Sequence, residues 1–183
     1  SVHQREGLAC VSCHTIHAAK DPLFVKTEQP GVCYKCHQPV RADFAKFSRH
    51  PVRDGNMDCT SCHAPHDSLN RGLLIASTVN DTCYTCHAEK RGPFLWEHPP
   101  AAEDCSLCHT PHGSVNPSLL VNRPPMLCQS CHSPAGHPSL AFTAGGLPGG
   151  GGAPNSMLVA GSCLNCHSQV HGSNDPSGSE LNR

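Results

Sequence analysis

The 183-residue sequence has little of the material from which a hydrophobic core is built. It contains one Trp, two Tyr and five Phe residues, against 16 Gly and 17 Pro. Ordering a chain costs conformational entropy that apolar burial has to offset, and aromatic side chains are among the strongest contributors to that burial. The composition therefore disfavours a domain held together by its own side chains, and it predicts that bound groups supply the missing apolar bulk.

Long apolar runs and an excess of charge of either sign are also missing. Apolar stretches such as 73–76 are far too short to cross a bilayer, and residues 1–7 are polar and do not resemble a targeting segment. Thirteen Lys and Arg balance 14 Asp and Glu, without a basic run. We therefore expect neither a nucleic-acid partner nor a membrane span formed by this chain itself.

Cysteine, in contrast, is abundant and strictly organised, because all 14 Cys fall into seven Cys-x-x-Cys-His motifs. Two thiols at this spacing can form thioethers to the two vinyl groups of one porphyrin, while the adjacent imidazole binds the iron from the same side. The sequence predicts seven covalently bound haem c groups. The predicted attachment points are Cys10, Cys13, Cys33, Cys36, Cys59, Cys62, Cys83, Cys86, Cys105, Cys108, Cys128, Cys131, Cys163 and Cys166. The predicted proximal iron ligands are His14, His37, His63, His87, His109, His132 and His167.

Other uses of paired cysteines fit this pattern less well. Zinc knuckles need no His directly after the second Cys, and an odd number of pairs would leave one knuckle without a partner. A disulfide framework does not require a fixed triplet spacing followed by His. Thioredoxin-like chemistry needs one such pair beside a βαβ pattern, and this chain has seven pairs and few strand signals.

Two kinds of motif alternate along the chain with a period of roughly 45 to 50 residues. Extended motifs carry a second His three or four residues after the motif His, and each plain motif is followed by a lone His that precedes Pro. We expect a single array over 1–183, with two-haem repeats at 10–58, 59–104 and 105–143, a Gly-rich loop at 144–155 and a terminal haem unit at 156–183. The additional His are His17, His66, His112 and His171 in extended motifs, and His50, His98 and His137 after plain motifs.

These seven additional His are the predicted distal ligands, because seven irons with one His each need a sixth ligand. In an extended motif the second His lies three residues past the proximal His and points the same way on a helical turn. It cannot reach the far face of its own haem, so we expect it to ligate a neighbouring haem and to join consecutive porphyrins. The lone His of a plain motif could reach its own iron or an adjacent one.

His3 exceeds what seven irons need. It lies seven residues before Cys10, just as His98 lies seven residues before Cys105. It therefore occupies the position of a lone His whose plain motif is absent from this chain. The spacing predicts that His3 serves an upstream haem of a longer array or an iron in another protomer.

Several segments resemble the decahaem cytochromes of the MtrA/DmsE type. They are Asn80-Asp-Thr-Cys83, Leu95-Trp-Glu-His98, His112-Gly-Ser-Val-Asn116 and the stretch from Ser162 to Gly178. The resemblance covers essentially the whole chain and maps it onto the last seven of ten haem motifs. It implies a haem wire inside an outer-membrane β-barrel porin. It also implies periplasmic donor cytochromes and an extracellular cytochrome or terminal acceptor as partners.

The expected fold is a mostly irregular and α-helical multihaem cytochrome c. A linear array of seven bis-His haems would be wrapped by short helices and loops, with little or no β-sheet. Closed, six-coordinate irons offer no open position for a substrate, so the expected function is electron transfer without catalysis. Because c-type haem is attached after export, the expected location is the periplasm or the outer membrane. A multihaem reductase of a small oxyanion with one open haem, and a filament-forming cytochrome, are the alternatives.

Overall fold

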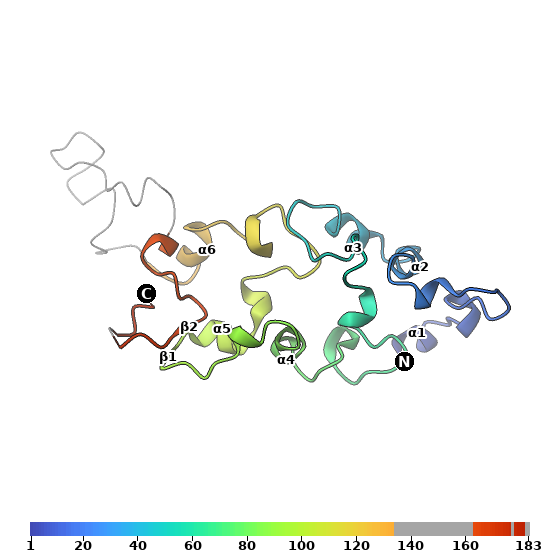
Figure 1. The fold of residues 1–183 in the computed structure, drawn as a ribbon, viewed down its shortest axis with the longest axis horizontal. Helices are drawn as coiled ribbons and strands as arrows, with labels where there is room; N and C mark the ends of the chain where they lie inside the picture. The colour runs from blue at the N-terminus through green and yellow to red at the C-terminus, as the bar shows by residue number, and fades with distance from the viewer. Residues whose placement is uncertain (134–162, 177, 182–183) are drawn as a thin grey trace.

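The computed structural model describes residues 1–133, 163–176 and 178–181. Figure 1 shows an elongated molecule with the blue N-terminal part toward one end of the long axis and the red C-terminal part at the other, while the chain between them doubles back along this axis. The predicted Gly-rich loop at 144–155 and the predicted ligand His137 lie outside the described residues. An elongated path suits a chain whose repeats follow one another in sequence order.

The described chain forms short helices joined by loops. The α-helices are α1 (Val2–Arg5), α2 (Gln29–Cys33), α3 (Gln38–Asp43), α4 (Val79–Tyr84), α5 (Pro99–Glu103) and α6 (Met126–Gln129). The 3-10 helices are η1 (Cys10–Ser12), η2 (Pro22–Phe24), η3 (Cys59–Ser61), η4 (Arg71–Leu73), η5 (Ala88–Lys90), η6 (Cys105–Leu107), η7 (Pro117–Leu119) and η8 (Cys163–Asn165). Proline occupies the first turn of α2, α3 and α5, where its missing N–H costs nothing.

The two kinds of motif differ in local structure. Each extended motif begins a 3-10 helix at its first Cys, as at Cys10 and Cys59. Each plain motif has its first Cys within an α-helix, as at Cys33 in α2 and Cys83 in α4. All seven motifs therefore lie on about one helical turn.

One small sheet joins the end of the described chain to its middle. Strands β1 (Trp96–Glu97) and β2 (Gly172–Ser173) pair antiparallel, with Trp96 opposite Ser173. The indole N–H of Trp96 donates a hydrogen bond of 2.9 Å to the carbonyl of Asp175. Gly172 has a φ of 138°, and a Cβ there would collide with the ring of Phe94, so glycine is required at this crossing.

A second long-range contact joins the first half of the chain to the third repeat. Ser48 and Ser114 form an isolated antiparallel bridge with hydrogen bonds in both directions. The neighbouring Gly113 approaches the Asp43 carbonyl so closely that a Cβ would not fit. Repeats far apart in sequence are held together by backbone contacts of this kind.

The apolar core formed by the protein alone is very small. Phe44 and Val52 are the buried hydrophobic side chains in the described ranges, whereas Phe24, Phe47 and Leu69 are at least 80% exposed. Apart from the two-residue strands, the described structure consists of short helices and loops. This confirms the expected fold of short helices and loops with little β-sheet. None of the described helices has the length and apolarity needed to span a bilayer.

Candidate metal centres

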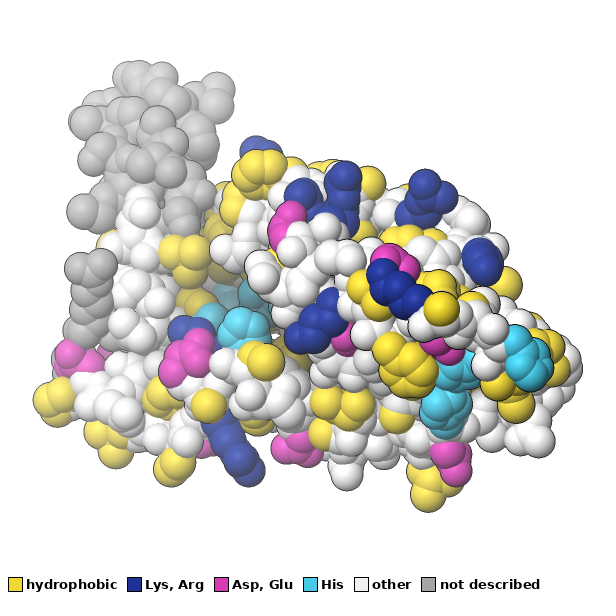
Figure 2. Space-filling view, turned by 45° about the vertical axis from the view of Figure 1, so that its right-hand side comes forward, with side chains coloured by type: hydrophobic (Ala, Val, Ile, Leu, Met, Phe, Trp, Pro, Cys, Tyr) yellow, Lys and Arg dark blue, Asp and Glu magenta, His cyan; other side chains and the backbone are white. Residues whose placement is uncertain are grey.

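A single continuous cavity of about 3370 Å³ runs through the described structure. It is lined by all 14 cysteines and all seven motif His. Ordinary small-molecule sites occupy roughly 300 to 1,000 Å³, so this cavity is far larger than one ligand requires. Figure 2 shows His side chains in a hollow of the surface and at one end of the molecule. The lining groups identify the cavity as the place where the predicted haems would lie.

The backbone of each motif closes one turn that sets the thiols and the imidazole. In every motif the N–H of the His donates to the carbonyl of the first Cys, four residues earlier, at 2.8–3.0 Å. This turn brings the motif His to the same side as the Cys pair. A porphyrin held by both thiols would therefore receive the motif His on its iron without any rearrangement of the chain.

Six motif His each face a second His across the cavity. Two metal–nitrogen bonds of about 2 Å, together with half of each imidazole ring, would place axial ring centres roughly 6 Å apart. The observed separations between ring centres are 5.8 to 6.3 Å. The pairs are His14 with His66, His37 with His3, His63 with His112, His87 with His50, His109 with His171, and His132 with His98. This spacing leaves room for one iron between the two rings of each pair.

The pairs follow two simple rules. The second His of an extended motif faces the motif His of the preceding extended motif, as His66 faces His14. The lone His before an extended motif faces the next plain motif, as His50 faces His87. The expectation that extended motifs join consecutive porphyrins is therefore wrong. The intervening plain motif is skipped, because the second His points back across the cavity to the previous unit of the same kind.

His3 corrects a second expectation. Its ring centre lies 6.1 Å from that of His37, and its Nδ1 donates to the Pro65 carbonyl at 3.1 Å. His3 is therefore placed opposite a motif His of this chain and needs no upstream haem or second protomer. Sequence spacing assigned it correctly to the class of His98, but the partner of that class lies downstream and not upstream.

Among the described His outside the motifs, His17, and not His3, is the one that has no facing motif His. It is exposed, and it is the described His that does not line the cavity. By the rule for extended motifs, its partner would be the motif His of a preceding extended motif, and these 183 residues contain none. The predicted ligand role of His17 at one of the seven irons has no geometric support in the described residues. The remaining predicted distal ligand, His137, is outside the described ranges.

Backbone carbonyls orient five of the paired rings. His63 Nδ1 donates to the Gly72 carbonyl at 2.7 Å, and His109 Nδ1 donates to the Ser118 carbonyl at 2.8 Å. A carbonyl can only accept, so Nδ1 carries the proton and Nε2 is free to bind a metal. Burial, and to a lesser extent the facing His63, lowers the pKa of His112. This favours the neutral ring that a metal requires.

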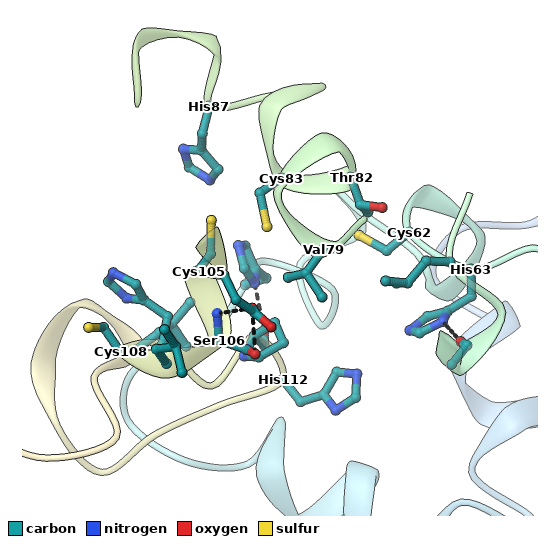
Figure 3. Close-up of a pocket in the computed structure, with 18 of the residues that line it drawn as sticks. Cys62, His63, Val79, Thr82, Cys83, His87, Cys105, Ser106, Cys108 and His112 are labelled. Atoms are coloured by element: carbon teal, nitrogen blue, oxygen red, sulfur yellow. Dashed lines mark hydrogen bonds between the residues drawn. The ribbon is translucent and has the colours of Figure 1, made fainter. Parts of the chain in front are cut away.

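The first cysteines of successive motifs meet across the cavity. A hydrogen bond between the thiols of Cys33 and Cys59 lowers the pKa of Cys33 to about 7 and raises the pKa of Cys59. Burial, and to a lesser extent the nearby Cys105, raises the pKa of Cys83 to about 12. Figure 3 shows the thiols of Cys83 and Cys105 pointing into the same space. Burial and the nearby Cys163 similarly raise the pKa of Cys128 to about 11.

The second cysteines meet at the alternate junctions. Cys86 lies close enough to Cys62, and Cys131 to Cys108, to raise the thiol pKa, although burial has the larger effect in both cases. Junctions between first cysteines therefore alternate with junctions between second cysteines. From Cys33 to Cys163, the attachment points form a row in which neighbours in sequence are neighbours in space.

Orphaned polar atoms test whether the cavity suits haem. The Tyr34 hydroxyl, the Arg49 Nε and the Ser168 Oγ are buried without a hydrogen-bond partner in the described structure, and all three residues line the cavity. Buried polar groups in native proteins are almost always paired. Protein atoms cover these three groups, however, so they do not open into the cavity, and a haem carboxylate there would not reach them. The fit to a porphyrin rests instead on the donor set of the cavity, in which paired thiols and facing imidazoles lie within a largely apolar lining.

Sequence reasoning missed these polar residues. Arg49 directly precedes the lone His50, but Lys and Arg are scattered along the chain and nothing in the pattern marks this one. The Asp21 carboxylate also went unnoticed, although it accepts a hydrogen bond of 2.8 Å from His14 Nδ1. Its position seven residues after a motif His is the one signal that could have indicated it.

Comparison with protein families gives three matches to one repeat model. The model is the doubled CXXCH motif, and it matches residues 3–42, 50–92 and 98–137. Each match begins at a lone His, namely His3, His50 or His98. The three imidazole pairs that contain these His therefore each lie within one matched unit.

Curated proteins with similar sequences are cytochromes. Multiheme cytochrome MtrA of Shewanella baltica is 51% identical over 183 residues, which are 100% of this chain and 55% of that protein. Cytochrome c-type protein NrfB of Haemophilus influenzae is 28% identical over 107 residues, 47% of this chain and 46% of that protein. High-molecular-weight cytochrome c of Nitratidesulfovibrio vulgaris is 30% identical over 99 residues, 44% of this chain and 18% of that protein. The chain thus spans about half the length of the first two relatives and a smaller part of the third.

Proposed function

Because this chain belongs to the MtrA-type multihaem cytochromes c, built from doubled CXXCH motifs that attach haem covalently, we propose that it conducts electrons along a row of seven haems. When bound, haem iron supplies a one-electron couple between Fe(III) and Fe(II). The chain's own task is to order these centres in a row, to fill their axial positions and to shield them from water.

The observation that carries the proposal is the set of facing imidazoles. Six motif His have a second His at the separation that an iron between them requires. Two strong axial ligands leave no position at which a substrate could bind to the metal. The same arrangement keeps the ligands unchanged between oxidation states, which is what electron transfer needs. It therefore supports conduction over reduction of an oxyanion.

The pairs also support a division of labour between the two kinds of additional His. The lone His of each doubled unit closes the plain motif within that unit, as His98 does for His132. The second His of an extended motif joins one unit to the preceding one, as His112 does for His63. We propose that the whole chain is one array of such units, with a terminal unit at 156–183.

Haem content tests the count of seven. The pyridine haemochrome spectrum of fully matured protein should give seven c-type haems per chain, and metal analysis should give seven irons and no zinc. Replacement of both thiols of one motif, Cys128→Ser with Cys131→Ser, should lower the count to six. A count below seven in the mature unmodified protein would contradict the proposal.

We further propose that the chain is exported and works at the outer membrane, inside a β-barrel partner. The similarity to MtrA supports this assignment, and the polar exterior of the chain needs a barrel to separate it from lipid. Periplasmic donor cytochromes and an extracellular cytochrome or terminal acceptor would be its electron partners.

Reconstitution into liposomes tests the barrel partnership. Purified holoprotein added to liposomes alone should give no electron transfer from external dithionite to an enclosed oxidant. Addition of the barrel should give transfer, and barrel alone or barrel with haem-free chain should not. Transfer by the cytochrome without a barrel would overturn this part of the proposal and leave the haem row intact.

A further inference from the structure

Three of the four extended motifs orient their motif His in the same way. His63, His109 and His167 donate from Nδ1 to the carbonyls of Gly72, Ser118 and Glu180, at 2.5–2.8 Å. In each case the next residue is a leucine with positive φ, namely Leu73, Leu119 or Leu181. A non-glycine residue in this region is strained, and the strain recurs because it presents the preceding carbonyl to the ring.

The first extended motif departs from this arrangement. His14 Nδ1 lies 2.8 Å from the Asp21 carboxylate, and the two side chains are 26% and 13% exposed. The other carboxylate oxygen accepts from the Leu23 N–H at 3.0 Å, so Asp21 also caps η2. Asn70 and Asn116 occupy the corresponding caps of η4 and η7. A full negative charge therefore replaces a carbonyl dipole at this one motif.

We propose that Asp21 is a tuning residue that lowers the reduction potential of the iron bound by His14 below those at His63 and His109. The inference rests on the proposed bis-His ligation. A carboxylate is ionised at neutral pH, and it draws the Nδ1 proton more strongly than a carbonyl does. The ring then donates more charge through Nε2, and this stabilises Fe(III) over Fe(II).

The position of this iron gives the tuning a consequence. Cys10 and Cys13 are the first attachment points of the row, and the facing ligand His66 comes from the next doubled unit. An electron on this iron is then held less tightly than on the irons of the other extended motifs. The iron bound by His14 is therefore an electron donor to the irons of the other extended motifs.

The test is a potentiometric titration of holoprotein, followed by haem absorbance and by EPR at one fixed pH. Asp21→Asn keeps the cap on η2, because Asn caps as well as Asp, and removes the charge. In Asp21→Asn, one of the seven centres should show a reduced-to-oxidised ratio at least tenfold higher than in the unmodified protein at any given potential. A tenfold change in this ratio corresponds to a shift of 59 mV in the reduction potential of a one-electron centre. Asp21→Glu should restore the ratio to within threefold of the unmodified protein.

Asp104→Asn is the matched control. Asp104 caps η6 beside Cys105 and accepts from the Ser106 N–H at 2.8 Å, but its recorded hydrogen bonds do not involve an imidazole. Asp104→Asn should leave the reduced-to-oxidised ratio of all seven centres within threefold of that in the unmodified protein. Tuning by Asp21 is refuted if Asp21→Asn also leaves the reduced-to-oxidised ratio of all seven centres within threefold of the unmodified protein. It is likewise refuted if this variant yields high-spin haem. High-spin haem in the unmodified protein would refute the proposed ligation itself, so the two failures are distinguishable on the same samples.

Discussion

Chain produced without covalent haem attachment should have no cooperative unfolding transition and should be digested within the first minutes of limited proteolysis. The reason is the nearly absent protein core, in which Phe44 and Val52 are the buried hydrophobic side chains among the described residues. The space between the repeats is a cavity of about 3370 Å³, and without its contents the lining side chains have no packing partners. Domains that fold around a metal or cofactor are typically unfolded without it.

Far-UV circular dichroism and tryptophan fluorescence would measure this effect. The single Trp96 donates to the Asp175 carbonyl and joins distant parts of the chain, so its emission should shift toward that of exposed tryptophan in the haem-free chain. Loss of one central haem, through Cys83→Ser with Cys86→Ser, should be milder and should lower the thermal midpoint of the holoprotein. A haem-free chain with native-like dichroism and a sharp melting transition would contradict the account.

Local features of the site could be predicted from the sequence because their determinants are local. The Cys-x-x-Cys-His spacing fixes one helical turn, and all seven motifs have the hydrogen bond from the His N–H to the first Cys carbonyl. The shortage of aromatic residues likewise predicted the nearly empty protein core. Both expectations depend on only a few consecutive residues or on composition, and neither needs a knowledge of which segments meet.

The partners of the additional His could not be predicted because they depend on contacts between repeats. His14 and His66 are separated by one whole plain motif, and His109 and His171 by more than sixty residues of sequence. Spacing alone placed His3 in the correct class of lone His but gave it the wrong direction. Long-range contacts such as the Ser48–Ser114 bridge and the pairing of β1 with β2 bring distant repeats together. No local sequence pattern predicts these contacts.

The two classes of His should therefore respond very differently to the same substitution. His66→Ala removes the ring that faces His14 at 5.8 Å, so the haem attached at Cys10 loses its sixth ligand. We expect one haem per chain to become high-spin and to bind carbon monoxide rapidly once reduced. The other six should stay low-spin, because His66 faces His14 and is not a ring partner of any other motif His.

His17→Ala is the matched control, since His17 is the other second His of an extended motif in this part of the chain. It is exposed and does not line the cavity, so the 183-residue holoprotein should keep seven low-spin haems and show no carbon monoxide binding. Absorbance and EPR of the two variants, prepared in parallel, measure the contrast.

Added imidazole shows that the effect of His66→Ala is loss of a ligand and not misfolding. Free imidazole can enter the vacated position, because the substitution leaves a space the size of one imidazole ring opposite His14, and it should restore the low-spin spectrum and suppress carbon monoxide binding. His3→Ala should behave like His66→Ala, but at the haem attached at Cys33, since His3 faces His37. A silent His66→Ala together with a high-spin His17→Ala would show that the facing rings do not share an iron. In that case both pairing rules would have to be abandoned.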